Sequence, residues 1–534
     1  MPRILHASFC AAVLICALAC GSGGNKSASP EPPDPANLVF PVEALQTSGE
    51  ASKRINLVVL GDGYREQDQA KLTQDAQAWL TAFRNTAPYG NYAEYFNVKL
   101  IHVASNEDGA DNGTAGLGVA RDTALGASFQ NANPPGLPPD YRLLVVDNAR
   151  ALAVAMANAP EFSKVLVLVN DAKYGGSGGL VPVFSANQES CRIALHEFGH
   201  SFGGLADEYS CGDTSPLPAS IEAYPNITTA QALDQIKWNR WILPGTLLPT
   251  PEDGAHFNVL GLFQGGYYHD GGIYRPKHAC RMRSLEDEFC EVCSEAIIRG
   301  VYSRIALIDA ASPASPVALD PQASVTLSIA FPAPVPNTLA VNWSVDGVGV
   351  MGTGGTYVLQ GSALTPGAHA VSARLCDGTR LVRGTPAECA HTWTVNVSAA
   401  APLLPVATPA SERHLMVLVI RDVTGLKVLD QKIIEAPCPV SEAGTWAFEL
   451  QDIEGRVLFR QGLEDPSALR GEFRNAEEPR RIDGHHRQRE GPVSFILRVP
   501  VIEASHLEVF EKSRKTGESW AHVGSVKLAE AMQP

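Results

Sequence analysis

The chain is short of positive charge. It carries 42 Lys and Arg residues against 57 Asp and Glu residues over 534 positions, which gives a formal net charge of −15. Proteins that bind nucleic acid need basic patches that neutralise phosphates. The locally basic stretch 480–489 is typical of a solvated loop rather than of a binding patch. The composition therefore predicts no nucleic-acid partner.

The chain also lacks a phosphate-binding loop and a membrane-spanning run. The glycine cluster at 174–179 is not followed by the Lys-Ser/Thr pair that ends a phosphate loop, so we interpret it as a mobile loop beside a cleft. The apolar run 9–18 is too short to cross a bilayer as a mature helix. We therefore expect neither a nucleotide site at these glycines nor a transmembrane segment in the mature protein.

The apolar run 9–18 follows a positive charge, which is typical of a signal peptide over 1–19 and predicts export. Residues 17–20, Ala-Leu-Ala-Cys, resemble the lipobox of bacterial lipoproteins, with cleavage before Cys20 and lipidation of its thiol. This predicts a lipoprotein of the cell envelope or outer membrane, held to the membrane through Cys20 and a flexible tether over 20–40. Ala17 stands where a larger aliphatic residue is usual, so ordinary cleavage to a secreted or periplasmic protein is the alternative.

Cysteine usage fits an oxidising compartment. Of eleven cysteines, eight follow the signal peptide and the lipidation candidate, and an even number outside the cell favours disulfides. Cys376 and Cys389 are the easiest pair to propose because both lie in one small domain. Cys280, Cys290 and Cys293 suggest a second zinc site as an alternative. We favour bridges, because no second CxxC motif completes a ligand set.

The chain does contain a compact hydrolytic motif, the sequence His-Glu-Phe-Gly-His at 196–200. On a helix, residues four apart share a face, so His196 and His200 can reach one cation while Glu197 leans toward the water to be activated. Apolar residues occupy the opposite face. Two imidazoles, one carboxylate and an open position form a catalytic zinc site, whereas a structural site is closed by four protein ligands.

The residues after the motif supply a candidate for that carboxylate. Gly203 and Gly204 are expected to stop the helix in a left-handed turn. The chain then returns an acidic pair, Asp207 and Glu208, toward the metal.

These residues resemble the metallopeptidase family named for IgA-cleaving peptidases, within the metzincin-like zinc proteases. The resemblance extends over about 55–301 and includes six further islands in order. They are Asn-Leu-Val-Val-Leu-Gly-Asp-Gly-Tyr at 56–64, Gly-Ala-Asp-Asn at 109–112, the glycine cluster at 174–179, Gly-Ile-Tyr-Arg-Pro at 272–276, and the paired segments Cys-Arg-Met-Arg-Ser at 280–284 and Phe-Cys-Glu-Val-Cys at 289–293.

The resemblance implies roles for further residues. The usual metzincin spacing places the third ligand at Ala206, which cannot bind metal, so Asp207 is our candidate and Glu208 the fallback. Met282 stands where a methionine-containing turn underlies the zinc. A tyrosine that stabilises the oxyanion would be Tyr268 or Tyr274, although each is also typical of an ordinary packing aromatic.

Two segments near the motif bear on substrate and cation binding. The run 165–169 predicts a buried central strand. The run 180–184 predicts an edge strand, because it contains a proline, and an edge strand could pair with an extended peptide; a connecting loop is the alternative. Calcium is possible at 106–112, but the spacing departs from a calcium loop and favours a solvated turn.

The predicted fold is multidomain: an α/β (α+β) zincin/metzincin-like catalytic domain over 41–305, followed by two all-β sandwich domains. The first, immunoglobulin-like, covers 306–400, with strands expected at 324–329, 339–343 and 392–397. The second covers 410–534, after a Pro/Ala-rich linker. Neither carries a catalytic pattern, and such domains space an enzyme from a surface or bind glycans or proteins.

The predicted function is an exported zinc endopeptidase that acts on protein or peptide, with one catalytic Zn²⁺ and Glu197 as general base and acid. Two alternatives stay open. One is a surface adhesion or glycan- or protein-binding lipoprotein with a peptidase-like domain. The other is an amidase that acts on cell-wall peptide. Immunoglobulin cleavage is not carried over from the family name, because specificity depends on cleft residues.

Overall fold

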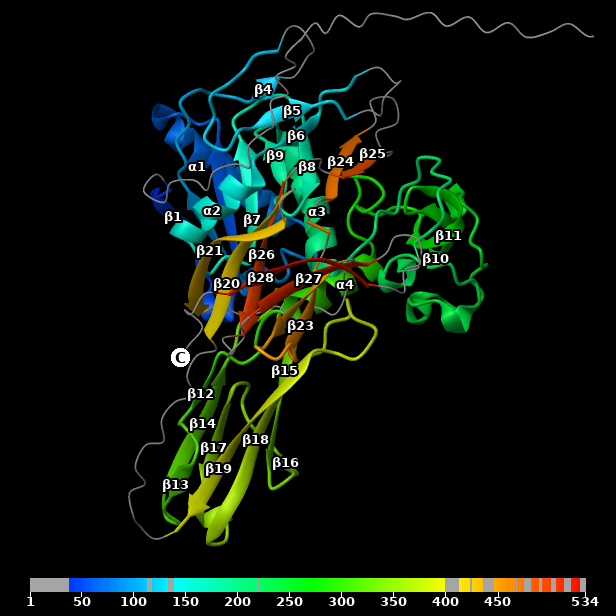
Figure 1. Ribbon diagram of the computed structural model, residues 1–534. Coiled ribbons are helices and arrows are strands. Elements are labelled where there is room, and N and C mark those ends of the chain that lie inside the picture. Colours follow the sequence, from blue (N-terminus) through cyan, green and yellow to red (C-terminus); the bar gives the residue numbers. More distant parts are fainter. Residues whose placement is uncertain are drawn as a thin grey trace, which may run out of the picture. The chain divides into compact units, whose positions relative to one another are not determined.

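The computed structural model describes residues 38–112, 118–132, 139–218, 220–398, 413–422, 425–435, 446–463, 465–466, 468–474, 482–488, 492–500, 506–512 and 520–528. The predicted signal peptide, Cys20 and most of the tether lie outside these residues. Within them the chain is mixed α/β, with six sheets and four α-helices (Figure 1). In the described part, no helix combines the length and the apolar character needed to cross a membrane.

The first part of the chain forms the largest sheet, in the order β1-β3-β2-β7-β9-β8-β6-β5-β4. Its centre is parallel: β2 pairs with β3 and β7, and β7 pairs with β9. The strands are β1 (Val42–Gln46), β2 (Ile55–Asp62), β3 (Phe96–Ile101), β4 (Asp111–Asn112), β5 (Ser128–Gln130), β6 (Leu143–Val145), β7 (Lys164–Val169), β8 (Gly176–Gly179) and β9 (Val183–Ser185).

Both faces of this sheet are buried, as expected for parallel strands covered by helices. In β2, Leu57 and Val59 face the cluster that holds α1 (Gln69–Asn85), α3 (Cys191–Gly203) and α4 (Glu291–Tyr302). The alternate residues Val58 and Leu60 face the cluster that holds α2 (Asn148–Asn158). The predicted strand at 165–169 follows the same alternation as β7, in the middle of the sheet.

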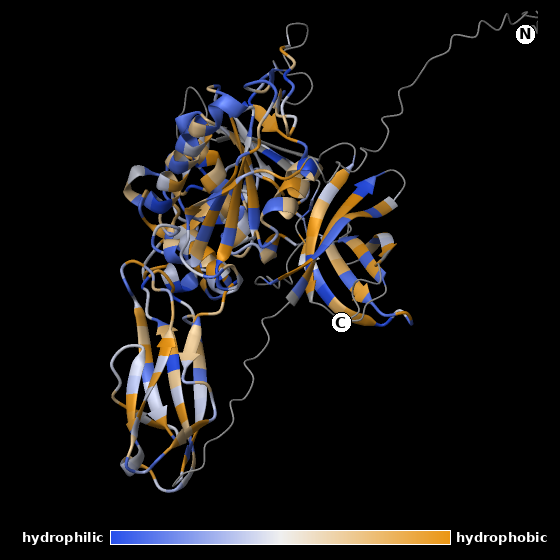
Figure 2. Ribbon diagram, turned by 90° about the vertical axis from the view of Figure 1, so that its left-hand side faces the viewer, coloured by the Kyte–Doolittle hydropathy of each residue, from blue (hydrophilic) through white to orange (hydrophobic). Residues whose placement is uncertain are grey.

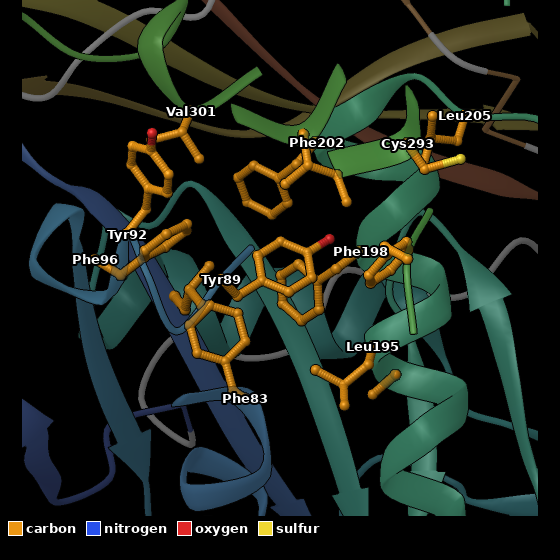
Figure 3. Packing of buried hydrophobic residues seen from close by; sticks show 14 of the residues in the cluster. Phe83, Tyr89, Tyr92, Phe96, Leu195, Phe198, Phe202, Leu205, Cys293 and Val301 are labelled. Atoms are coloured by element: carbon orange, nitrogen blue, oxygen red, sulfur yellow. The ribbon is translucent and has the colours of Figure 1, made fainter. Parts of the chain in front are cut away.

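The first of these clusters is rich in aromatic rings, which fix the position of α3. Phe198 and Phe202 of α3 stack with ring centroids 5.3 Å apart, and Phe198 also packs on Phe83 of α1 and on Tyr89 (Figure 3). Each fully buried aromatic side chain contributes about 1.5–3 kcal/mol through removal from water. The apolar face of the motif helix is therefore anchored in the core, which turns its opposite face toward the site.

Two sequence expectations about the strands beside α3 are wrong. The glycine cluster is not a loop: its last four residues form strand β8, which pairs with β9 and β6. The run 180–184 does not form an edge strand, because β9 begins only at Val183 and lies between β7 and β8. Pro182 precedes the strand, so its missing N–H costs no ladder bond, and its carbonyl accepts from the N–H of Val167.

The segment between α3 and α4 carries little regular structure. It contains four single-turn 3-10 helices and one two-stranded ribbon, β10 (Leu260–Gly266) with β11 (His269–Lys277). The 3-10 helices are Ile221–Ala223, Leu233–Gln235, Asn239–Trp241 and Gly254–His256. The turn of the ribbon holds Tyr267 and Tyr268, both at positive φ (46° and 68°), which is uncommon for bulky residues.

Residues 310–397 form two sheets that share one hydrophobic cluster, which includes Trp343 and Trp393. The strands alternate hydrophobic and hydrophilic residues, as Figure 2 shows by colour. The sheets are β12-β14-β17 and β13-β19-β18-β15-β16. Their strands are β12 (Ala310–Ser312), β13 (Val317–Leu319), β14 (Ser324–Ala330), β15 (Leu339–Val345), β16 (Val348–Val350), β17 (Thr356–Gln360), β18 (Gly367–Asp377) and β19 (Glu388–Val397).

The predicted disulfide between Cys376 and Cys389 is not present. In the β18–β19 register, Cys376 lies opposite Glu388 and Cys389 lies opposite Leu375. Because neighbouring residues of a strand point to opposite faces, the two thiols are on different faces of the sheet. All the cysteines of the described residues are free thiols, so the structure does not support the predicted bridges.

The last part of the chain is also all β. It forms the sheets β21-β20-β26 and β23-β22-β27-β28, and a hairpin of β24 and β25. Strand β24 pairs with β8 of the large sheet, so the hairpin extends that sheet. The strands are β20 (Arg413–Asp422), β21 (Gly425–Glu435), β22 (Trp446–Gln451), β23 (Val457–Leu463), β24 (Ala468–Arg474), β25 (Ile482–Gln488), β26 (Val493–Pro500), β27 (His506–Lys512) and β28 (Trp520–Lys527).

Candidate functional site

The site lies on the polar face of helix α3, opposite the face that carries its aromatic residues. The helix runs from Cys191 to Gly203 and ends where Gly204 takes a left-handed conformation, with φ of 59°. Its last carbonyls are capped, since the N–H groups of Gly204 and Leu205 donate to His200 and Gly199. The predicted helix stop therefore forms as expected, and the chain turns back toward the histidines.

This return places Asp207 against both histidines. Its Oδ1 lies 3.0 Å from Nε2 of His196 and 3.3 Å from Nε2 of His200, and the two Nε2 atoms are 3.2 Å apart. All three side chains are almost fully buried. We call these three residues the histidine site. Donors held at about 2.0–2.1 Å from one tetrahedral zinc lie about 3.3 Å from one another, so the three atoms fit the ligands of a single zinc ion.

Backbone carbonyls determine which ring nitrogen of His196 and His200 faces the histidine site. Nδ1 of His196 lies 2.9 Å from the carbonyl of Arg281, and Nδ1 of His200 lies 2.7 Å from the carbonyl of Leu205. A carbonyl oxygen only accepts, so each Nδ1 carries the proton and donates. Each Nε2 then faces the histidine site: it contacts Asp207 while it carries a proton, and it offers a lone pair to a metal when that proton is lost, which is the usual outer-shell arrangement of metal-binding histidines.

Asp207 is held in its ionised form. Burial raises the pKa of this carboxyl, but the charge of His200 and the bonds from both histidines outweigh burial and hold the pKa well below its usual range. Its second oxygen, Oδ2, accepts a 2.5 Å hydrogen bond from the hydroxyl of Tyr268. Tyr268, one of the two tyrosines proposed from the resemblance, therefore lies beside the histidine site with its hydroxyl directed at Asp207.

Tyr268 reaches Asp207 because the ribbon turn is bonded to the returning segment. The N–H of Tyr267 donates to the carbonyl of Asp207, and the N–H of Tyr268 donates to that of Tyr209. The carbonyl of Tyr268 in turn accepts from Cys211. These bonds account for two consecutive tyrosines at positive φ, a costly conformation that persists where the surroundings dictate it.

Glu197 is buried beneath strand β8, with 1% of its surface exposed. A Cβ atom added to Gly178 of β8 would lie 1.8 Å from the carboxyl carbon of Glu197. The strand can cover this carboxylate only because it has no side chain there. Oε2 of Glu197 also lies 3.7 Å from the guanidinium of Arg470 in β24. The contacts of Glu197 with Gly178 and Arg470 were not predictable from the sequence, because the glycine cluster that contains Gly178 is typical of a loop.

The other candidates have separate places. Met282 is fully buried beneath α3, and its sulfur would lie 2.6 Å from a Cβ at Gly199, which agrees with a methionine turn under the site. Tyr274 is buried in the hydrophobic core, and its backbone pairs with that of Thr228. The segment 106–112 is separate from the two metal-binding clusters found among the described residues.

Glu208, the fallback third ligand, does not face the histidine site. Its side chain is fully buried beside three cysteines, and its Oε1 lies 3.0 Å from Sγ of Cys293. Successive residues of the extended segment therefore point in opposite directions, Asp207 to the histidines and Glu208 to the cysteines. We call Glu208, Cys280, Cys290 and Cys293 the cysteine cluster; their ligand atoms all lie within 4.8 Å of one another.

Comparison with known proteins identifies the class of this domain. The region that holds the histidine site, residues 43–260 and 252–301, matches a family of peptidases. The family is the IgA Peptidase M64 family, and the chain belongs to it, as the resemblance predicted. Peptidase chemistry and a protein substrate follow from this membership.

Two other comparisons add little. No curated protein matches the chain. Among solved structures, the chain is similar to Bacteroides ovatus mixed-linkage glucan utilization locus (MLGUL) SGBP-B in complex with mixed-linkage heptasaccharide, with 13% identity over 42% of this chain and 70% of that one. The TM-score of 0.13 is too low for this likeness to carry an argument about fold or ligand.

Proposed function

We propose that the chain is a zinc-dependent endopeptidase of zincin-like fold in which His196, His200 and Asp207 hold the metal. The observation that carries this proposal is the convergence of two Nε2 atoms and one carboxylate oxygen within 3.0–3.3 Å. Three protein donors with a fourth position open to water are typical of catalytic zinc. When bound there, Zn²⁺ supplies Lewis acidity and lowers the pKa of water toward neutrality.

Glu197 is the proposed general base and acid. It follows His196 directly, so it lies on the rim of the same helix face. Its carboxylate accepts a proton from the attacking water and later returns it to the leaving amine, so that one group serves both halves of the reaction. Burial under β8 keeps bulk water away from this proton transfer.

Strand β8 is the proposed binding edge for the substrate, in place of the run 180–184. Gly178 and Gly179 form the end of β8 that the hairpin strand β24 now pairs with, directly above Glu197. An extended peptide that took the place of β24 would hydrogen-bond to this edge and lie across the histidine site.

The test is metal content together with cleavage of an unstructured protein such as casein, by wild type and by Glu197→Gln. We expect both proteins to bind zinc and only the wild type to cleave, because the amide keeps the shape of Glu197 and loses the base. Equal cleavage by both proteins would exclude this mechanism. Zinc binding without any cleavage would direct the search to a narrower peptide or to cell-wall peptide.

We also propose that the enzyme is exported and lipidated at Cys20, on the support of the signal-like residues 1–19 and the lipobox-like residues 17–20. Mass spectrometry of the mature N-terminus from a bacterial host tests this. A diacylglyceryl mass on Cys20 is the expected result, and Cys20→Ala should abolish it. An unmodified N-terminus on an exported protein would support the secreted or periplasmic alternative.

A further inference from the structure

We propose that the cysteine cluster is a second, structural zinc site. It combines three thiols and one carboxylate, four donors in all, and every one of these residues is buried. A closed set of four protein ligands rich in thiolate is typical of structural zinc, and thiolates favour zinc over hard cations. The site is distinct from the histidine site, which contains no sulfur.

The distances within the cluster fit a metal better than a disulfide. Sγ of Cys280 lies 3.6 Å from Sγ of Cys293. Two thiolates bound at about 2.3 Å to one tetrahedral zinc lie about 3.8 Å apart, whereas the sulfurs of a disulfide are about 2.0 Å apart. The N–H of Cys290 donates to Sγ of Cys280, a contact that would be charge-assisted with a metal-bound thiolate.

Glu208 provides an independent indication. Its Oε1 accepts from the amide of Asn226, while its Oε2 is buried and has no hydrogen-bond partner among the described residues. A buried carboxylate oxygen without a partner costs several kcal/mol in desolvation unless a cation compensates it. A metal bound by the neighbouring thiols would supply that partner.

The local backbone explains why three cysteines converge. Cys290 caps α4 and Cys293 lies in its first turn, while the N–H groups of Arg283 and Ser284 donate back to the carbonyl of Cys280. The cluster thus joins the methionine turn, the start of α4 and the segment after α3. A metal there would cross-link the segment after α3 to the methionine turn and the start of α4, which lie far from it along the chain.

The test uses the full chain, purified with reductant and without chelator, and measures zinc per chain. We expect two zinc ions in the wild type and one in the double variant His196→Ala/His200→Ala. Cys290→Ser and Cys293→Ser should each lose one, and Cys211→Ser, an exposed thiol outside the cluster, should keep both. The histidine variant keeps the test decisive even if a cysteine variant fails to fold.

Cobalt substitution gives a second readout that does not depend on activity. Thiolate-to-cobalt charge-transfer absorption should persist in the histidine double variant, since only the cysteine cluster contains sulfur. Its absence there, together with a single zinc in the wild type, would overturn the proposal. Loss of two titratable thiols from the denatured wild type would instead show a disulfide and would overturn it equally.

A different observation supports a second inference: we infer that the β24–β25 hairpin is an autoinhibitory strap. This rests on the proposed function. Strand β24 pairs with Gly178 and Gly179 of β8, the edge assigned to substrate, and Arg470 places its guanidinium 3.7 Å from Oε2 of Glu197. The hairpin therefore fills the peptide position and sets a positive charge beside Glu197, the proposed general base.

Arg470→Ala should raise cleavage of casein several-fold and should increase hydrogen exchange at the amides of β8. Arg456→Ala, an exposed arginine of the same C-terminal part that pairs with Asp452, is the matched control and should change neither. Unchanged or lower cleavage by Arg470→Ala, from an active wild type, would overturn the strap. If no variant cleaves, the proposed function fails, and exchange at β8 still reports whether the hairpin covers this edge.

Discussion

At the scale of single residues, the two carboxylate oxygens of Asp207 contact different partners. Oδ1 faces the two histidines and Oδ2 accepts the hydroxyl of Tyr268. Hydrogen bonds of this kind orient a metal ligand and commonly change metal affinity by about 10–100-fold. We therefore expect the hydroxyl of Tyr268 to act on the proposed metal through Asp207, as a positioning group.

Tyr268→Phe should weaken zinc binding at the histidine site by about tenfold or more, because Asp207 loses the bond that orients it. Competition with a chromogenic chelator measures this affinity. Tyr267→Phe removes a hydroxyl from the neighbouring residue and should leave the affinity unchanged. If both variants bind zinc as tightly as the wild type, Tyr268 does not position Asp207, and a role toward substrate becomes the better hypothesis.

At the scale of elements, strand β8 and helix α3 are fitted to each other at Gly178. Gly178→Ala adds a methyl group where the carboxyl of Glu197 lies, so either strand β8 or the carboxylate of Glu197 must move. A displacement of about 1 Å at a catalytic group costs about 100-fold in rate. We expect turnover to fall by about that factor with zinc content unchanged. Gly254→Ala, where a Cβ meets nothing within 4 Å, is the control, and equal activity of the two variants would contradict this fit.

Elements with a strong period were predictable from sequence, and elements defined by their neighbours were not. The continuous apolar run 165–169 predicts β7, and the histidine spacing with Gly204 predicts α3 and its end. Strand β8 was not predicted because glycine has low strand propensity, so a run of glycines is typical of a loop. The reason for glycine here is the carboxylate of Glu197 packed against Gly178, which the sequence does not show. The edge assignment at Pro182 failed because the proline precedes its strand.

The site shows the same limit. Spacing predicted that the two histidines share one helix face beside Glu197, and the family resemblance made Asp207 the candidate for the third ligand, with Glu208 as the fallback. Spacing alone does not separate these two adjacent acids, because the choice depends on which way an extended segment is rotated. The cysteine cluster also looked incomplete in sequence, since its fourth member, Glu208, lies far from the cysteines along the chain.

At the scale of the whole molecule, stability and metal content are expected to be linked. A ligand that binds only the folded state raises the free energy of unfolding by about 4 kcal/mol when its free concentration is a thousand times its dissociation constant. Chelation should therefore lower the melting temperature of the wild type. It should also lower that of the histidine double variant, because the cysteine cluster still holds zinc there. A melting temperature of the double variant that chelator leaves unchanged would contradict a structural metal.

The adjacency of Asp207 and Glu208 has a consequence for anyone who transplants this active site. A single peptide link joins a proposed ligand of one metal to a proposed ligand of the other, so an inserted or deleted residue at this point would rotate one of them out of its place. Copying helix α3 into a new scaffold would carry two histidines and a base, but not the carboxylate in its working position. The portable unit is larger: the helix, the acidic pair, the tyrosine turn and the three cysteines, moved together.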